Sequence, residues 1–362
     1  MTAHETIDQQ QAQAFVGKVL GDTTGTTNTV LAHIGDRLGL FKDLAANGPA
    51  TSAELARRTG IHERYAREWL SGMAAATYLT YDPHSGQFAL PPAHALTLAD
   101  DGGPMFFGGV HQELLGTVRT LDTVADAFRT GGGVRIEAFD KDTWEGIERF
   151  TNGWFNNLLL QHWLPLLPGV QAKLERGASV ADIGCGHGRA LIKLAQTFPN
   201  SRYVGYDVGA FQIARAQANA EAAGVADRVR FEQRDAAKGL PERYDLVTTF
   251  DVVHDTVDPR GLLRAIRQAL RPDGIYVCLE INCSDKLEEN IHPVGALFYG
   301  FSVLLCLTQS LAEHGEGLGT MGLPESKLRE LSTDAGFGSV RRVPMDNPFN
   351  SLYEIRASIG GI

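Results

Sequence analysis

The second half of the chain alternates short apolar runs with amphipathic segments. Short apolar runs bounded by turn residues predict buried strands, and apolar side chains recurring every three or four positions predict helices. The runs are 180–183, 202–206, 229–233, 244–250 and 275–281, and the amphipathic segments are 190–198, 211–223, 260–270 and 324–334. Two further strands are expected at 338–343 and 351–358. This order predicts an α/β domain with a Rossmann-like sheet of seven strands, ending in an antiparallel pair.

The first hundred residues have a helical pattern. Helices are expected at 15–20 and 29–44, after a polar and frayed lead-in at residues 1–12. Thr51 and Glu54 form a capping-box signature for a short helix that runs to residue 58, and a second helix follows at 62–76. Short strands at 79–81 and 87–90 then supply a hairpin. Residues 1–103 are therefore expected to form a winged-helix domain that also serves dimerisation, with 29–44 as its apolar helix.

Two segments fit neither pattern. Residues 104–172 are rich in aromatic side chains and are expected to form a helical linker that contributes to a substrate pocket. In the third region, residues 173–362, the stretch 282–323 is too long for an ordinary loop in a compact sheet. We expect this stretch to be an insertion that contains a helix at 294–307 and forms a lid over the mouth of the site.

Composition narrows the class of protein. The chain has 362 residues, 43% of them hydrophobic, which is enough for two domains with their own cores. Its net charge of −10 disfavours binding to nucleic acid or to anionic membranes. The sequence shows no signal-peptide pattern and no evident run of about 18 apolar residues, so a soluble cytoplasmic protein is expected. The four cysteines form no C-x-x-C pair, which predicts reduced thiols.

A glycine-rich turn follows the first strand of the second half. The turn carries Gly184, Gly186 and Gly188 and leads directly into a helix. Such a turn presents backbone N–H groups and a helix N-terminus to a small ligand. A dinucleotide fingerprint requires a third glycine where this chain has Arg189, and the G-K-[ST] ending of a triphosphate loop is missing. Both phosphate-binding interpretations are therefore weakened.

The segment Asp182-x-Gly184-x-Gly186-x-Gly188 resembles the first motif of class I S-adenosylmethionine (SAM)-dependent methyltransferases. The resemblance implies that these glycines let the backbone approach the amino-acid end of the cofactor. Asp207 ends the second strand, where Rossmann-type sheets place the acid that binds ribose hydroxyls. Capping of the next helix is the alternative role for this residue.

The resemblance extends to later strand ends. It implies that Asp235, with Arg234 beside it, binds the adenine amino group, whereas an Asx-turn is the alternative role of Asp235. Val208, Phe250 and Asp251 complete the expected cofactor contacts, because they follow or end the second and fourth strands. The cofactor expected from these residues is S-adenosyl-L-methionine.

His254 and Asp255 follow the fourth strand and are the candidate catalytic residues. This segment resembles small-molecule O-methyltransferases of the plant and hydroxyindole types, where a His-Asp pair at this place supplies the base. A neutral imidazole suits removal of a hydroxyl proton near neutral pH. The tryptophan that follows the pair in that family is Thr256 here. A routine hydrogen bond at a helix entry is the alternative role of His254.

Two questions about His254 stay open in the sequence. Glu313 and Glu316 are candidates for an acid that orients its ring, but spacing aligns neither of them. A metal site built from His254, Asp255 and His292 is a further alternative, because imidazole and carboxylate groups are suitable ligands.

The expected function is SAM-dependent O-methylation of a small-molecule metabolite by a homodimer, with His254 as general base. Methylation of carbon or nitrogen, with or without a metal, and a SAM-binding enzyme that does not methylate are the alternatives within this fold. A SAM-sensing DNA-binding regulator is the alternative outside enzymes. Residues 51–76 contain four arginines and three glutamates, a net charge of +1, which disfavours DNA.

Overall fold

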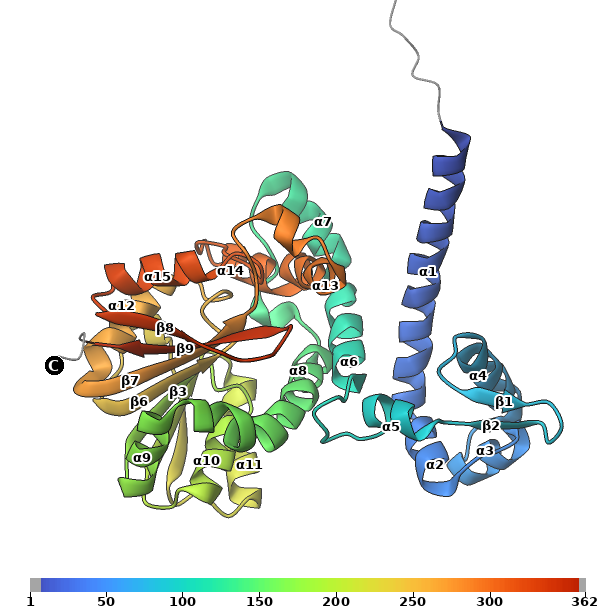
Figure 1. Ribbon diagram of the computed structural model, residues 1–362, viewed down its shortest axis with the longest axis horizontal. Coiled ribbons are helices and arrows are strands. Elements are labelled where there is room, and N and C mark those ends of the chain that lie inside the picture. Colours follow the sequence, from blue (N-terminus) through green and yellow to red (C-terminus); the bar gives the residue numbers. More distant parts are fainter. Residues whose placement is uncertain (1–7, 358–362) are drawn as a thin grey trace, which may run out of the picture. The chain divides into compact units, whose positions relative to one another are not determined.

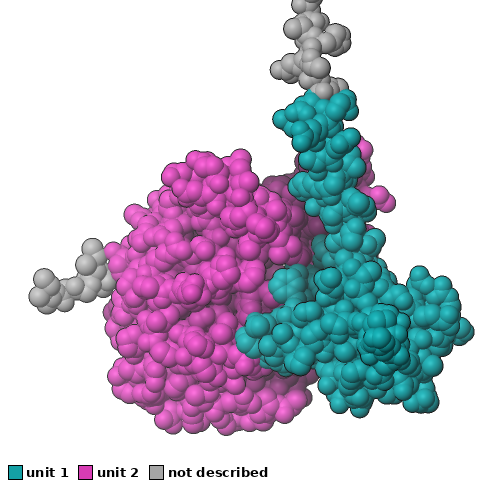
Figure 2. Space-filling model, turned by 45° about the vertical axis from the view of Figure 1, so that its right-hand side comes forward, with its two compact units in different colours: residues 1–115 teal, residues 116–362 magenta. Residues whose placement is uncertain are grey.

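The computed structural model describes residues 8–357 and comprises two compact units, residues 1–115 and 116–362 (Figures 1 and 2). Most of the expected lead-in, residues 1–7, and residue 358 of the last expected strand lie outside the described residues. The elements of unit 1 are α1 (Gln9–Arg37), α2 (Leu40–Asn47), α3 (Ser52–Thr59), α4 (Glu63–Ala75), β1 (Thr80–Asp82), β2 (Gln87–Ala89), α5 (Pro92–Leu98) and most of α6 (Gly108–Thr117).

Unit 1 contains the expected helix-turn-helix and hairpin. The Thr51 hydroxyl accepts a hydrogen bond from the Glu54 N–H, and the Glu54 carboxylate accepts one from the Thr51 N–H at 2.8 Å, which fixes the start of α3. Gly60 ends α3 with a φ of +73°. Leu55, Leu70 and other buried side chains of α2, α3 and α4 form one core, and β1 pairs antiparallel with β2. The winged-helix prediction is confirmed.

The first helix is longer than the hydrophobic pattern predicted. α1 runs unbroken from residue 9 to 37, so residues 9–12 belong to this helix. In the polar segment between the two expected helices, threonine hydroxyls donate to carbonyl groups four residues earlier, as from Thr23 to Val19 at 2.8 Å and from Thr29 to Gly25 at 2.9 Å, so these polar side chains are satisfied within the helix. The expected helix 29–44 is interrupted at Gly39, whose φ is +71°.

Unit 2 holds a seven-stranded sheet and the helices around it (Figure 1). Its helices are η1 (Val118–Thr120), α7 (Leu121–Thr130), η2 (Ile136–Ala138), α8 (Lys141–Trp154), η3 (Phe155–Trp163), η4 (Leu164–Leu166), α9 (Pro168–Arg176), α10 (Arg189–Thr197), α11 (Ala210–Ala222), η5 (Ala236–Lys238), α12 (Pro259–Ala269), η6 (Leu287–Asn290), α13 (Pro293–Phe301), η7 (Ser302–Cys306), α14 (Leu307–Ala312) and α15 (Glu325–Asp334). Its strands are β3 (Ser179–Ile183), β4 (Arg202–Asp207), β5 (Val229–Gln233), β6 (Tyr244–Phe250), β7 (Leu270–Ile281), β8 (Ser339–Val343) and β9 (Asn350–Arg356).

The strand order is β5-β4-β3-β6-β7-β9-β8, parallel from β5 to β7. β9 lies antiparallel between β7 and β8. This arrangement is the predicted Rossmann-like sheet with a terminal antiparallel pair. Because side chains alternate along a strand, the sheet has an apolar core on each face.

Each face is covered by its own helices (Figure 1). Val180 and Leu246 lie in the core that includes residues of α9, α10 and α11. Their neighbours Ala181 and Val247 lie in the other core, with residues of α12 and α15. The two cores hold the strands in fixed register, and their carboxyl ends define one edge where side chains from several strands come together.

The insertion 282–323 packs against the helices that precede the sheet. Val124, Val134 and Phe139 share a small apolar cluster with Leu305 and Cys306. The Val134 N–H donates to the Thr308 carbonyl at 3.1 Å. The expected helix 294–307 is present as α13 and the π-helical turn η7, and it continues into α14.

Residues 282–323 also contain a long apolar run. Within residues 8–357, the helical run Pro293–Ala312 is long and apolar enough to cross a membrane, by length and composition, and 33% of its most apolar window is buried. The expectation that no such run exists is therefore corrected. Helices that pack inside a protein have the same composition, so this feature alone does not place the run in a membrane.

Candidate active site

The centre of the sheet forms a crevice. From β3 the chain proceeds through β4 and β5 to one edge, and it then returns to β6, which pairs parallel with β3. Asp182 of β3 lies opposite Thr248 of β6. The winding direction therefore reverses between these two strands, and ligands of such sheets bind beyond the carboxyl ends at this point.

The glycine turn between β3 and α10 has a backbone that favours glycine. Gly184, Gly186 and Gly188 have φ angles of +65°, +51° and +76°. A Cβ on Gly184 would lie 2.5 Å from a methyl group of Val252, and one on Gly188 would lie 2.5 Å from the Phe231 ring. A Cβ on Gly186 would meet nothing within 4 Å. Two glycines thus allow close packing, whereas Gly186 leaves its face of the turn open to a ligand.

A cavity of about 110 Å³ lies beside this turn. α8 contributes Trp144 and Thr151 to its wall, and Phe155 and Phe250 add aromatic rings. The walls also include Asp182, Gly184, Gly186, His187, Arg189 and Gln212. This volume suits a small polar group with an apolar neighbour, because whole ligands usually fill several hundred Å³.

Asp182 and Asp207 are carboxylates at the ends of neighbouring strands. Burial raises the pKa of Asp182 to about 7, although the Thr248 hydroxyl, which donates to it at 2.6 Å, opposes the rise. Asp207 accepts hydrogen bonds from the N–H groups of Gly186 and Gly209, each at 2.9 Å. Burial also raises the pKa of Asp207, against these two bonds. Asp207 therefore holds the glycine turn in place.

The residues expected at the adenine end lie away from the cavity. Asp235 caps η5 through a bond from the Ala237 N–H at 3.1 Å and pairs with Lys238 at 3.2 Å, so the Asx-type contact is present. The Arg234 guanidinium lies 5.8 Å from the centre of the Tyr206 ring. Val208 is 52% exposed. Val208, Arg234 and Asp235 do not line the cavity beside the glycine turn.

Phe250 ends β6 and Asp251 follows it, and the two side chains have different surroundings. The Phe250 ring lines the cavity and lies 5.2 Å from the Phe155 ring, edge to face. Asp251 has a φ of +55°, and its carboxylate accepts hydrogen bonds from the Asn350 side chain at 2.7 and 3.0 Å. Burial, assisted by Glu280, raises the pKa of Asp251 to about 7.

His254 is buried just beyond β6 and forms a pair with Glu280. Its Nδ1 lies 2.7 Å from Glu280 Oε2, and the other carboxylate oxygen accepts the Val253 N–H at 2.7 Å. Burial alone lowers the pKa of His254. The Glu280 carboxylate and the Cys306 side chain outweigh burial and hold this pKa well above its usual value.

The acid that orients His254 is therefore neither of the two that the sequence offered. Glu313 pairs with Arg135 at 3.0 Å, and Glu316 pairs with Arg260 at 3.3 Å. Glu280 lies near the end of the apolar fifth parallel strand, β7. The sequence did contain a signal for Glu280. This residue is an acid within an otherwise apolar run, 275–281, and a buried charge requires a partner.

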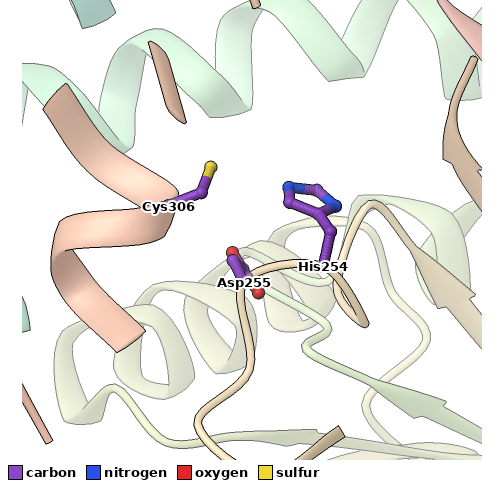
Figure 3. Close-up of side chains that lie close together, drawn as sticks. All are labelled: His254, Asp255 and Cys306. Atoms are coloured by element: carbon purple, nitrogen blue, oxygen red, sulfur yellow. The ribbon is translucent and has the colours of Figure 1, made fainter. Parts of the chain in front are cut away.

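Cys306 is the other neighbour of His254 that the sequence did not identify. Figure 3 shows one ring nitrogen of His254 facing the Cys306 sulfur, with Asp255 below them. One ring nitrogen of His254, one carboxylate oxygen of Asp255 and the Cys306 sulfur all lie within 4.8 Å of one another. Burial raises the pKa of Asp255 to about 7. His292 is not in this group, because its Nδ1 accepts the Gly295 N–H at 3.1 Å and caps α13.

A second histidine–glutamate pair lies on the other side of the crevice and was also missed. His187, in the glycine turn, places Nδ1 at 2.8 Å from Glu148 Oε2. The Arg189 Nε donates to the other oxygen of Glu148 at 2.8 Å. Both acid and imidazole are buried. The spacing of 39 residues between them gave no local signal.

Together these features define the class of fold. A sheet ordered 3-2-1-4-5-7-6 in its own strand numbering, with an antiparallel seventh strand, a glycine turn after its first strand and an acid ending its second, is a class I methyltransferase fold. In sheets of this kind, ligands bind beyond the carboxyl ends of the two central strands, next to the segment that carries His254.

Comparison with known proteins agrees with this class. Residues 174–304 match the family described as methyltransferase domain, and residues 26–100 match the Rv2258c-like winged HTH domain. The chain therefore carries a winged helix-turn-helix domain and a methyltransferase domain. Human N-acetylserotonin methyltransferase, solved in complex with SAM, has a similar structure with a TM-score of 0.71, at 18% identity over 99% of this chain and 100% of that one.

Curated relatives are O-methyltransferases. The mitomycin biosynthesis 6-O-methyltransferase of Streptomyces lavendulae is 27% identical over 86% of this chain and 88% of its own length. The ubiquinone biosynthesis O-methyltransferase of Cereibacter sphaeroides is 32% identical over 110 residues, which are 30% of this chain. This match spans 44% of the length of that relative.

Proposed function

We propose that the protein is a SAM-dependent O-methyltransferase acting on a hydroxyl group of a small molecule, with His254 as the general base. The observation that carries the proposal is the buried His254–Glu280 pair just beyond β6. Val252, two residues before this histidine, packs directly against Gly184 of the glycine turn. The segment that carries His254 and the glycine turn thus pack against each other.

The names of the relatives support oxygen as the acceptor atom. Relatives named for mitomycin, ubiquinone and acetylserotonin biosynthesis are all O-methyltransferases of small molecules. A crevice with aromatic walls at Trp144, Phe155 and Phe250 favours an apolar or aromatic acceptor.

The residues of the crevice fit the cofactor. Gly186 leaves open space at the turn, and Asp207 ends the strand next to it, where a ribose would lie. Asp235 and Arg234 would face the adenine. When bound, SAM supplies an electrophilic methyl group on a positively charged sulfur. Phe155 and Phe250 suit that charge, because aromatic faces attract cations.

His254 and its neighbours perform the proton transfer in this proposal. Glu280 accepts the Nδ1–H and raises the pKa of His254, so Nε2 removes the proton of the acceptor hydroxyl at a pH high enough to leave Nε2 unprotonated. The Glu280 carboxylate then stabilises the charged imidazolium. Asp255 lies beside the same imidazole and would accept a hydrogen bond from the acceptor or relay its proton. General base catalysis of this kind contributes about 10²–10⁴-fold to the rate.

Residues 104–172 and the insertion 282–323 would wall and close the acceptor pocket. The packing of Val134 and Phe139 against Leu305 and Cys306 joins the two segments. Since Cys306 lies beside His254, movement of the insertion would change access to the base. Closure would exclude water from the methyl transfer.

Calorimetry and product analysis test the function. We expect measurable heat on adding SAM or S-adenosylhomocysteine (SAH) and none on adding NAD. Methyl-labelled SAM, incubated with a panel of simple phenols, should give products labelled on oxygen. Silence toward SAM and SAH with clear heat from NAD contradicts the proposal, and labelling on carbon or nitrogen supports the alternative transferases of the same fold.

We also propose that the protein is a cytoplasmic homodimer that does not bind nucleic acid. α1 exposes Phe15, Val16 and Leu20 to 63%, 68% and 66%. Such an apolar face on a long helix favours pairing with a second copy. The net charge of −10 disfavours DNA. Light scattering should give twice the monomer mass, and a mobility-shift assay at moderate salt should give no shift.

A further inference from the structure

The glycine turn contains a buried histidine whose second nitrogen lacks a partner. His187 is 6% exposed, and its Nδ1 is bonded to Glu148. Its Nε2 is fully buried and has no hydrogen-bond partner within residues 8–357. His187 lines the cavity beside Gly186. An orphaned buried polar atom is costly, so a ligand in this cavity would gain by pairing with it.

Glu148 fixes the proton arrangement of this ring. The Glu148 carboxylate also accepts hydrogen bonds from Arg189 at 2.8 Å and Asn219 at 3.3 Å. Burial opposes ionisation of Glu148, but His187 and Arg189 outweigh it and lower its pKa to about 2. An ionised carboxylate only accepts hydrogen bonds, so His187 Nδ1, which lies 2.8 Å from Glu148 Oε2, carries the proton. The ring is therefore held in one orientation, with Nε2 directed away from Glu148.

The position of the cavity indicates which end of a ligand meets Nε2. Asp207 and Asp235, the acids placed for the nucleoside, do not line the cavity. Its volume of about 110 Å³ is too small for a nucleoside, and Asp182 provides a second polar group in its wall. The nucleoside must therefore lie outside, and the cavity receives the other end of the ligand.

We propose that His187 Nε2, positioned by Glu148, hydrogen-bonds the amino-acid group of SAM. This inference rests on the proposed function and adds a cofactor-binding residue to it. Imidazole nitrogen accepts from an ammonium group or, when the ring is charged, donates to a carboxylate. Both groups occur only at the amino-acid end, so the contact distinguishes SAM and SAH from a shortened nucleoside such as 5′-methylthioadenosine.

Ligand truncation combined with mutation tests this contact. Calorimetry of His187→Leu should give a Kd for SAH that is about ten- to a hundredfold higher than that of the wild type, because a hydrogen bond to a charged group is lost. The Kd for methylthioadenosine should change by less than about twofold, since this ligand makes no contact with the imidazole. His187→Gln, which keeps a polar group near Nε2, should recover much of the SAH affinity. His84→Leu, at an exposed histidine in the β1–β2 turn, is the matched control.

The outcomes separate the two proposals. Equal loss of affinity for both ligands, or no loss for either, overturns the role of His187 while the function stands. A wild-type protein that binds neither SAH nor methylthioadenosine overturns both. Histidine ¹⁵N spectra of the wild type keep the test independent of variant folding. SAH should shift the His187 Nε2 signal and methylthioadenosine should not, and equal responses to the two ligands overturn the contact.

Discussion

Two buried histidine–glutamate pairs, whose histidines follow the neighbouring strands β3 and β6, have nearly the same geometry. The Nδ1 to Oε2 distance is 2.8 Å for His187 and Glu148 and 2.7 Å for His254 and Glu280. Their surroundings differ. Glu148 is balanced by an arginine, whereas Glu280 accepts backbone N–H groups and influences its histidine directly. Under the two proposals above, the charge around the acid, rather than the pair itself, distinguishes a histidine that binds the cofactor from one that transfers a proton.

The largest expected effect is on turnover and comes from the pair of His254 and Glu280. His254→Ala should lower kcat by about 10²–10⁴-fold, because the general base is lost. The Kd for SAH should stay within about twofold, since His254 is not placed against the cofactor. Turnover of methyl-labelled SAM and calorimetry measure the two quantities. His162→Ala, at an exposed histidine of η3, is the control, and full turnover in His254→Ala contradicts the base role.

Replacement of Glu148, whose charge is balanced by Arg189, should instead lower the stability of the protein. Glu148→Gln should lower the free energy of unfolding at pH 6 by about 3 kcal/mol, because Arg189 loses its buried partner. A lowered pKa means that the Glu148 carboxylate stabilises the fold above about pH 4.5 and loses this effect as the pH falls toward about 2. Urea unfolding at several pH values should therefore show the difference narrowing toward acid. A constant difference would contradict the assigned charge.

Glu280→Gln sharpens the comparison through the pH profile. Glu280 raises the pKa of His254, so without the carboxylate burial lowers this pKa. The base works when unprotonated, so the acidic limb of kcat/KM should move to lower pH, while kcat falls by about ten- to a hundredfold. Glu148→Gln should leave this limb in place. If both variants moved the limb alike, the distinction between the two pairs would fail.

The smallest expected effect comes from Gly186, the glycine of the turn that faces open space. Gly186 and Gly224 both have positive φ, at +51° and +68°, and a Cβ on either meets nothing within 4 Å. Alanine at each site should cost about 1 kcal/mol of stability through backbone strain. Gly186→Ala should in addition raise the Kd for SAH about tenfold or more, because the methyl group occupies ligand space. Equal SAH affinities of the two variants would show that this face is not used.

Local patterns predicted much of the fold. The alternation of apolar runs and helical segments correctly predicted the seven-stranded sheet, and the capping box at Thr51 marked the start of α3. The unbroken helix α1 was missed because its middle is exposed and carries no hydrophobic period. Its threonine hydroxyls bond to the preceding turn of the same helix, and hydrophobic spacing does not record such bonds.

The sequence by itself determined the glycine turn, the strand-end acids and the position of His254 at the carboxyl edge of the sheet. Each of these depends on neighbours within a few residues and on the order of the strands. Tertiary structure alone decided that Glu280, rather than Glu313 or Glu316, holds His254, and that Glu148 and Cys306 lie beside His187 and His254. These contacts join elements that are far apart in the chain. Packing of strands and helices sets which side chains meet, and residue spacing does not contain that information.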